Sequence, residues 1–335
     1  MGRYVVRRVL LIVPTLVGLS ILTFVVSHLM PADPAKLAAG PRATADMVQT
    51  IRHEYGLDRP LSVQYVTYVR DLLRGNWGTS IISQHPVLTD LRLYLPNTLE
   101  LVLASMTIAI GVGVPLGVIA AVSQNRWPDH LSRLFTISFV SLPSFWFAII
   151  LQLTIAFTLG LLPVDGQLPT LTAPPHRVTG MVLVDSLLVG NLPLLWTAFQ
   201  HLILPAFVQS IGAMAIITRM VRGDMLEILG QDFVRTARAK GLSARRVVLG
   251  HALRNAFIPT LTLIGLSFGF SLGGSVLVET VFDWPGIGLY AVNAALSADF
   301  EPIMGVTIMV GFIFIVLNLV VDLLYGVLDP RIRYT

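Results

Sequence analysis

The chain contains no cysteine among its 335 residues. This absence excludes disulfide bonds, catalytic thiols and thiolate metal sites, and it leaves the redox compartment undetermined. Charge is also scarce, because Asp, Glu, Lys and Arg make up only 13% of the residues, against roughly 25% in an ordinary soluble domain. With 54% hydrophobic residues and a mean hydropathy of +0.75, the composition indicates an integral membrane protein.

Signatures of common catalytic sites are missing as well. The chain has no Gly-rich phosphate loop of the GxxxxGK[ST] kind and no HExxH zinc motif. We therefore expect that it is not an enzyme, that it does not hydrolyse ATP itself, and that it holds no cofactor of its own.

The N-terminus, residues 1–30, is predicted to be a membrane anchor. Arg3, Arg7 and Arg8 precede residues 9–30, a run of 22 residues without Asp, Glu, Lys or Arg. At 1.5 Å per residue such a helix can cross a hydrocarbon core about 30 Å thick. A cleavable signal peptide is the alternative, but the run is long for its apolar region and offers no small-residue cleavage site.

Residues 31–97 are polar and contain no candidate span. Within them, residues 61–73 fit an amphipathic helix. The residues near one face are Val63, Val66, Val69 and Leu73. We expect a small folded cap outside the membrane.

The rest of the chain, residues 98–335, contains five further apolar runs. They lie at about 98–123, 134–162, 196–218, 256–278 and 303–321. With the N-terminus inside, 15 of the 23 Lys and Arg fall on the cytoplasmic side and 8 outside, and seven of those eight lie in the long first loop, which the positive-inside rule weights little. The sequence therefore predicts an all-α membrane protein with six transmembrane helices and both termini in the cytoplasm.

One more apolar run, residues 181–196, is interrupted by Asp185, Gly190 and Pro193. As a seventh span it would invert everything after it and place the most basic loop outside. We therefore interpret it as an interfacial or extracytoplasmic helix.

Ionisable residues are rare inside the predicted spans, which argues against an ion or proton pump. The residues that could line a polar pathway are Ser138, Ser141, Pro143, Ser144, Gln152 and Gln209. The alternative for such groups is a helix-end position or a hydrogen bond between helices.

Glycines recur every fourth residue at 265, 269 and 273, and again at Gly113 and Gly117. Small residues at this spacing let helix backbones approach closely, so we expect tight helix packing, either within the chain or against a partner subunit.

The most basic segment is residues 230–259, between the fourth and fifth spans. Eight of the 23 Lys and Arg lie within residues 219–254. A solvated loop and a DNA-binding helix-turn-helix are alternatives, but spans tether both ends too closely for DNA binding. We predict a rigid elbow that docks on a cytoplasmic partner.

The pattern inside the elbow is a helix over about 232–240, a break at Gly241-Leu242, and a second helix from Ser243. Gly241 suits the left-handed residue that ends a helix, and the Ser243 hydroxyl can cap the next one.

Nine stretches in order resemble one family over nearly the whole chain. They are RRVLLIVPTLVGLSILTF with MPADP, GLDRPLSVQY, LLRGNWGTSI, LPNTLEL, GVPLGVIAA, SLPSFW, DFVRTARAKGLSARRVVLGHALRNAFIP, VLVETVFDWPGIG and LLYGVLDPRIR. The sequence resembles the B-type permease subunit of bacterial dipeptide and oligopeptide ABC importers. The resemblance implies six transmembrane helices of the type I ABC importer kind, with a small extracytoplasmic domain between the first two.

The resemblance also implies that the loop 219–257 carries a coupling helix that inserts into a cleft on an ATPase subunit. The family pattern is EAA, three residues, Gly, nine residues, then I-x-L-P, and here Gly241 is the glycine. Residues 235–237 read Arg-Thr-Ala in place of EAA, and 251–254 read His-Ala-Leu-Arg in place of I-x-L-P. These departures put in doubt the acidic ATPase contact of other families. The coupling surface implied is Asp232, Arg235, Thr236, Ala237, Gly241, Leu242, Ser243 and Arg246.

Outside the membrane, the resemblance implies a substrate-binding protein that docks on residues 31–97 and on 279–288. The candidate docking turn is Asp283, Trp284, Pro285 and Gly286, for which a purely structural turn is the alternative. The other partners implied are a second, C-type permease subunit and two ATPase subunits or domains that bind ATP and Mg. No nucleic acid is expected, and the location is the bacterial plasma (inner) membrane.

Three competing functions remain open at this stage. The same machine could import nickel complexes, haem, glutathione or opines instead of peptides. A secondary transporter or channel would need buried charges or inverted repeats, and neither is evident. A scaffold without transport would not need kinked spans that carry Ser and Gly.

Overall fold

The computed structural model describes residues 2–29, 34–39, 43–54 and 56–328, and the regular elements in this part of the chain are all helical. The predicted all-α class is confirmed. The elements are α1 (Gly2–Leu29), α2 (Pro34–Ala39), α3 (Ala45–Glu54), α4 (Leu61–Leu73), α5 (Val87–Val122), α6 (Trp127–Ser141), α7 (Ser144–Leu151), the π-helix η1 (Gln152–Thr158), α8 (Val182–Val189), α9 (Leu192–Leu229), α10 (Asp232–Ala239), the π-helix η2 (Arg246–Ala252), α11 (Leu253–Val281), α12 (Ile287–Leu296) and α13 (Phe300–Leu328).

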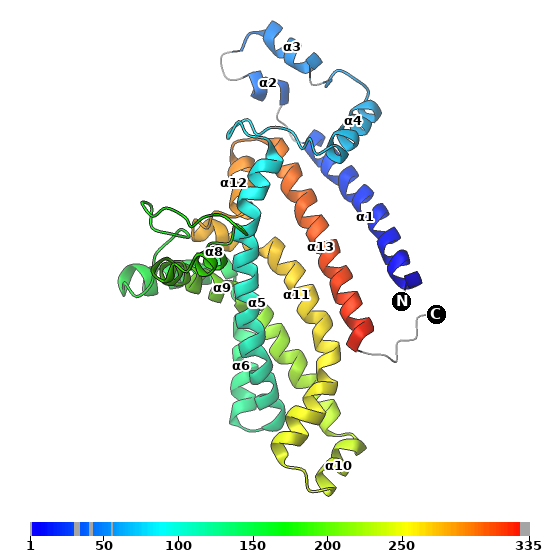
Figure 1. The fold of residues 1–335 in the computed structure, drawn as a ribbon, viewed down its shortest axis with the longest axis vertical. Helices are drawn as coiled ribbons and strands as arrows, with labels where there is room; N and C mark the ends of the chain where they lie inside the picture. The colour runs from blue at the N-terminus through cyan, green and yellow to red at the C-terminus, as the bar shows by residue number, and fades with distance from the viewer. Residues whose placement is uncertain (1, 30–33, 40–42, 55, 329–335) are drawn as a thin grey trace.

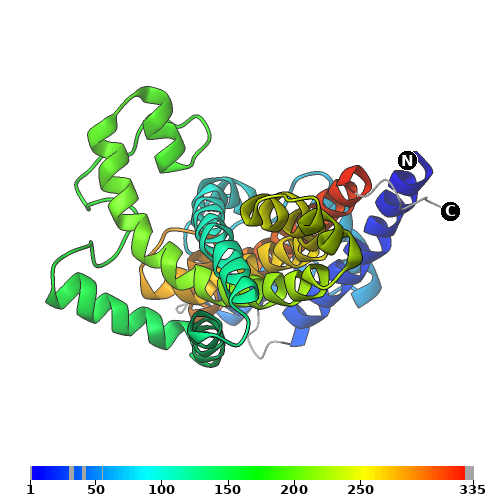
Figure 2. The same ribbon diagram turned by 90° about the horizontal axis from the view of Figure 1, so that it is seen from below.

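The molecule is elongated, with α2, α3 and α4 at one end and α10 at the other (Figure 1). We call these the cap end and the elbow end. The long helices α5, α9 and α11 run between them, and α1 and α13 lie side by side along one flank. Seen from below, α7, η1 and α8 project sideways from the long helices (Figure 2).

Among the described residues, four helices are long and apolar enough to cross a membrane: Val87–Val122, Leu192–Leu229, Pro259–Val281 and Phe300–Val320. A fifth candidate is the pair Trp127–Ser141 and Ser144–Thr158, and α1 contributes a shorter apolar helix, Ile12–Val26. The count of six spans therefore stays a prediction.

The predicted third span, 134–162, is wrong as a single helix. The chain bends by 101° between α6 and α7. Leu142, the residue before Pro143, is extended at ψ 129°, because a following proline disfavours the helical conformation of its predecessor. The break is either a broken span or a re-entrant loop.

Other helix boundaries also differ from the prediction. α5 begins at Val87, directly after Pro86, so residues 87–97 are helical and continuous with the predicted second span, while the bounds of the cap stay a prediction. The run 181–196 divides at Gly190, whose positive φ of 74° ends α8 before α9 begins at Leu192. The short separate helix is confirmed, and its place relative to the membrane stays a prediction.

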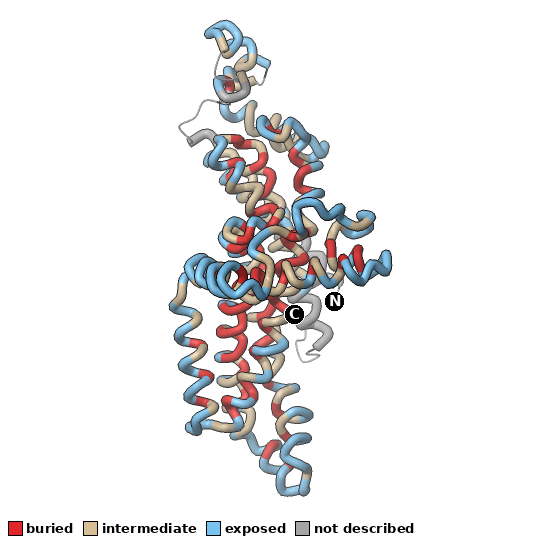
Figure 3. Tube along the Cα trace, turned by 90° about the vertical axis from the view of Figure 1, so that its left-hand side faces the viewer, coloured by how far each residue is buried: buried red, intermediate tan, exposed pale blue. Residues whose placement is uncertain are grey.

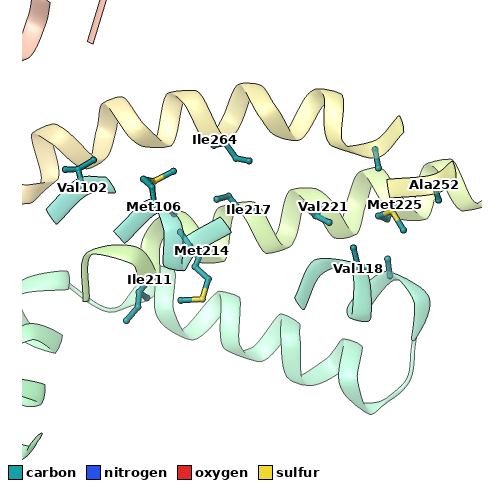
Figure 4. Close-up of a cluster of buried hydrophobic side chains, with 14 of the residues drawn as sticks. Val102, Met106, Val118, Ile211, Met214, Ile217, Val221, Met225, Ala252 and Ile264 are labelled. Carbon is teal, nitrogen blue, oxygen red and sulfur yellow. The ribbon is translucent and has the colours of Figure 1, made fainter. Parts of the chain in front are cut away.

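The main core lies between α5, α9 and α11 (Figure 3). Side chains such as Met106, Met214, Ile217 and Val221 fill it (Figure 4).

Gly113 and Gly117 let α5 and α9 approach closely. A Cβ on Gly113 would lie 3.0 Å from the Met214 carbonyl, and one on Gly117 only 2.7 Å from Val221 Cβ. The Thr218 hydroxyl donates to the Gly113 carbonyl at 3.1 Å. The predicted tight packing at this glycine pair is confirmed, and it lies within the chain.

The glycines of the fifth span differ in how closely other helices approach them. A Cβ on Gly269 would overlap the Phe314 ring of α13, whereas Gly273 has open space around it. Close packing within the chain is confirmed at Gly269.

Residues 265–273 also match GxSxG twice, but inside α11 rather than at the strand-to-helix turn that a nucleophile elbow needs.

Candidate functional site

At the elbow end, α10 is closed by a Schellman motif, a defined helix C-terminus. Gly241 N donates to the Arg238 carbonyl at 2.9 Å, and Leu242 N donates to the Ala237 carbonyl at 3.3 Å. Gly241 has a φ of +74°, the left-handed conformation that this motif requires. The predicted helix, break and glycine are confirmed.

The helix that follows starts without the predicted hydroxyl cap. The Ser243 hydroxyl accepts no hydrogen bond from the N–H of Arg245 or Arg246, and the Ser243 carbonyl accepts the first helical hydrogen bond, from Val247 N at 3.0 Å. The first full turns of this helix are the π-helix η2, which leads directly into α11.

The elbow has a small hydrophobic core of its own. Val234 and Ala237 of α10 pack with Val247 of η2, and the last residues of α9, Ile228 and Leu229, cover them together with Leu242. Because three elements share this core, α10 is fixed to α9 and η2 and can move only with them.

The predicted coupling residues divide into two groups. Ala237 is buried and Leu242 partly buried in the elbow core, so they hold the elbow together and do not form its surface. The exposed members are Asp232, Arg235, Thr236, Gly241, Ser243 and Arg246. The exposed surface over residues 232–246 carries five Lys and Arg against one Asp, so it suits an acidic partner surface.

Phe233 adds an apolar contact that the sequence analysis missed. It is 40% exposed on α10, directly after the exposed Asp232. A large aromatic side chain on an otherwise polar projecting helix is a typical anchor at protein interfaces. The sequence shows this aromatic residue directly after Asp232, so it could have been recognised there as a possible contact residue.

A buried ion pair near the elbow end was also missed. Arg222 of α9 donates through Nη2 to Asp129 Oδ2 of α6 at 2.9 Å and through Nε to Oδ1. Asp129 is fully buried and also accepts from Asn125 N at 3.0 Å, while Arg133 lies 3.7 Å away. The pair fixes the 123–127 turn and the start of α6 to α9, and no local pattern reveals it because the partners are 93 residues apart.

A second polar network lies toward the cap end, centred on Glu279 near the end of α11. Its Oε1 accepts from the hydroxyls of Thr98 and Ser275, each at 2.8 Å. Its Oε2 accepts from Gly288 N at 2.7 Å and Leu289 N at 3.0 Å. One buried carboxyl group therefore joins α5, α11 and the start of α12.

The turn before α12 is bonded to α5 by further groups. Trp284 Nε1 donates to the Asn97 carbonyl at 2.9 Å, and Asn97 Nδ2 donates to the Pro285 carbonyl at 2.7 Å. Gln167, from the loop after η1, donates to Glu100 at 2.8 Å and to Asn97 Oδ1 at 3.3 Å. The network thus ties two loops to one helix.

This network limits which docking residues can face outward. Trp284 is fully buried and Gly286 is buried, so neither presents a surface in the folded chain. A Cβ on Gly286 would overlap Thr98 Oγ1 and the Glu279 carboxyl group, so only glycine fits there. Asp283 is exposed in the left-handed conformation at φ 47°, and Pro285 is partly exposed. The docking role stays a prediction, and Asp283 is its best-placed residue.

Asp185 of α8 closes the neighbouring loop. It accepts from Thr179 N and Thr179 Oγ1, both at 2.7 Å, and from the backbone N–H groups of Val178 and Gly180 at 3.1 and 2.9 Å. Burial alone raises the pKa of Asp185, but these donors outweigh burial and hold the pKa below its usual range. Asp185 therefore has a structural role that the sequence analysis did not assign.

The candidate pathway residues lie in two settings. Those on the surface around the bend are Ser138, Ser141, Pro143 and Ser144. Gln152 donates to the carbonyls of Val164 and Val281 at 3.0 Å, and Gln209 donates to the Ser271 carbonyl at 3.1 Å. Both glutamine amides thus link helices or loops, and a pathway role for any of the six stays a prediction.

Known proteins match this chain over its whole length. It is 46% identical over 315 residues, 94% of this chain and 93% of the relative, to a probable D,D-dipeptide transport system permease protein of Escherichia coli K12. It is 41% identical over 331 residues, 99% of both chains, to a dipeptide transport system permease protein of Alkalihalophilus pseudofirmus. The fold resembles a chain of the MetNI methionine ABC transporter in an inward-facing form, at a TM-score of 0.52 and 16% identity, over 70% of this chain and 93% of that one.

The family profiles cover nearly all of the sequence. The profile described as binding-protein-dependent transport system inner membrane component matches residues 113–334, and the profile of its N-terminal region matches residues 1–102. The chain belongs to the family of inner membrane components of binding-protein-dependent transport systems.

Proposed function

We propose that this chain is one of two permease subunits of an ATP-driven importer of di- and oligopeptides. It forms half of the translocation pathway and couples it to cytoplasmic ATPases. Peptide cargo is supported by the dipeptide permeases to which the chain is 46% and 41% identical.

The observation that carries the coupling role is the elbow. It is a compact unit with its own core, it stands at the extreme end of the long helices, and its exposed surface is basic with one aromatic anchor. A partner that moves α10 must move α9 and η2, because these elements share buried side chains. ATP-driven closure of the ATPases would therefore rock the helices that border the pathway, as in a two-state domain movement.

The remaining parts of the machine lie in other chains. ATP and Mg bind to two ATPase subunits or domains, a second permease completes the pathway, and a substrate-binding protein docks on the cap end. The elbow then faces the cytoplasm, as do both termini, and the chain is a multi-pass protein of the bacterial plasma membrane.

The test compares two glycines of the elbow. Gly241→Ala places a side chain in the left-handed conformation, which costs about 1–2 kcal/mol locally, although no neighbouring atom blocks it. Gly230→Ala is the matched control, because Gly230 has an ordinary helical conformation at φ −81° and its Cβ would make only a van der Waals contact with Glu227. Both variants are assembled with the partner subunits in vesicles, and dipeptide-stimulated ATP hydrolysis is measured.

We expect Gly241→Ala to reduce peptide stimulation several-fold while the complex still assembles, because about 1–2 kcal/mol shifts a local equilibrium about 5- to 30-fold. Gly230→Ala should keep full stimulation. Equal stimulation in both variants would show that the elbow does not transmit the ATPase movement.

A further inference from the structure

α4 of the cap has two different faces. On one face, Tyr65 and Tyr68 form hydroxyl hydrogen bonds with Ser20 and Thr23 of α1, at 2.9 and 3.2 Å. The Phe24 ring of α1 lies 5.4 Å from the Tyr65 ring and 5.9 Å from the Tyr68 ring. These contacts hold α4 against the anchor helix.

The other face of α4 is apolar and uncovered. Val66 is 65% exposed and Leu73 84%, and Val63 lies on the same side with 41% exposed. No described part of the chain packs on this face. A stripe of this kind on a short helix is unfavourable in water.

The contact with α1 lies at membrane depth. Ser20 and Phe24 follow Val9, the start of the charge-free run, by 11 and 15 residues. At 1.5 Å per residue they lie about 17–23 Å along a run about 33 Å long. With the orientation given under the proposed function, on which this step rests, Ser20 lies near the middle of the bilayer and Phe24 lies in its outer half, so the contact extends from the middle of the bilayer toward the outer surface.

The surroundings of the contact are also apolar. Thr23, which bonds Tyr68, lines a groove between α1 and α13 whose walls are Leu22, Val26, Phe300, Ile303, Met304 and Thr307. Leu22 and Val25 of α1 are exposed beside it. The uncovered face of α4 therefore lies beside an exposed apolar surface of α1, at the same depth in the membrane.

The charges near α4 suit a lipid headgroup layer. Arg59 precedes the helix, Arg70 lies in its last turn and Arg74 caps its end, and all three side chains are exposed. Basic side chains beside an apolar stripe, with tyrosines at the boundary, are typical of helices that lie in a membrane interface.

We propose that α4 is an interfacial helix whose Val63, Val66 and Leu73 face is embedded in the phospholipid of the outer leaflet. It fixes the cap to the membrane surface through lipid on one side and through α1 on the other.

The absence of native cysteine allows a direct test with single-cysteine variants. Val66→Cys and Leu73→Cys are labelled with an environment-sensitive fluorophore. The full chain is then placed in vesicles of phosphatidylethanolamine and phosphatidylglycerol, both alone and assembled with its partner subunits. Asp46→Cys is the control, because α3 has no buried residues and lies at the tip of the cap, beyond α4 (Figure 1). Quenching by lipids that carry a nitroxide on the acyl chain is compared with quenching by external iodide.

We expect the ratio of nitroxide to iodide quenching to be several-fold higher at positions 66 and 73 than at position 46. Strong iodide quenching at all three positions would place the face in water and overturn the proposal. Protection from both quenchers in the assembled complex would overturn it as well, since a protein subunit would then cover the face. The readout needs no ATP hydrolysis, and iodide on one side of the vesicle reports the orientation separately, so failure here differs from failure of the importer function.

Discussion

Removal of the Glu279 carboxyl group should destabilise the cap end of the helix bundle. Glu279→Ala leaves the N–H groups of Gly288 and Leu289 without an acceptor. Each buried unsatisfied donor costs about 1–3 kcal/mol, so the two give roughly 2–6 kcal/mol. We expect the lower half of this range, because Leu289 is only partly buried.

The two hydroxyl partners differ in what they lose. Ser275 keeps a second acceptor, the Leu272 carbonyl at 3.0 Å, whereas the buried Thr98 O–H loses its Glu279 acceptor and keeps only the hydrogen bond that it accepts from Ile287 N at 2.9 Å. Glu279→Gln should be much milder. Its one amide oxygen can stay on the two backbone N–H groups while its NH2 group turns toward the hydroxyls, a loss of about 1 kcal/mol.

Thermal unfolding in detergent, followed by tryptophan fluorescence, measures these effects, because Trp284 is buried in the same network. Thr280→Ala is the control, since its exposed hydroxyl bonds only to the Val276 carbonyl of its own helix. The expected order of stability is Thr280→Ala, then Glu279→Gln, then Glu279→Ala. Equal losses for Gln and Ala, or an Ala variant as stable as the control, would refute the account based on unsatisfied N–H groups.

Two further predictions concern the contacts of α9. Asp129→Asn should lower the free energy of unfolding by an amount at the lower end of about 3–5 kcal/mol, because the side chain of Arg222 keeps 21% exposure. Arg133→Gln should cost less than about 1 kcal/mol, because Arg133 Nε lies 3.7 Å from Asp129 Oδ1. A double-mutant cycle with Arg222→Gln checks this, and additive losses would contradict a direct pair. Gly117→Ala should destabilise the α5–α9 contact, because its Cβ would lie 2.7 Å from Val221 Cβ, while Gly111→Ala meets no atom within 4 Å and serves as the control. Unchanged unfolding midpoints for both would contradict the close approach.

Local sequence patterns predicted the elements that depend on local chemistry. The amphipathic run 61–73 became α4 with the same bounds, and the Gly241 break became a Schellman motif. Both follow from side-chain periodicity and from the conformational freedom of glycine, which a single segment contains.

The errors come from interactions that a single segment does not contain. The bend of 101° before Pro143 was missed when residues 134–162 were predicted as one span, because the size of a proline break depends on what packs around it. Trp284 was assigned to a surface, although the Asn97 carbonyl, 187 residues away, holds its indole N–H in the interior. The Asp129–Arg222 pair was invisible for the same reason, since charge counting along loops does not show which charges meet.

The prediction of coupling residues was limited by a related ambiguity. An amphipathic helix of eight residues indicates which side chains share a face, but not which face is covered. Ala237 belongs to the covered face because Val247 and Ile228 pack against it, and only the three-dimensional arrangement of α9 and η2 reveals this.

The length of α9 converts a small tilt of the helix into a larger displacement of the elbow. The helix continues without interruption for 38 residues, past an internal proline at 205. From Pro205 to its end at Leu229 it forms a rod about 36 Å long. A tilt of about 5° at the proline then displaces the tip by about 3 Å, comparable to the rise of two helical residues. A small change in the tilt of α9 near Pro205 would thus appear at α10 as a displacement of a few ångström, because both ends belong to one continuous helix.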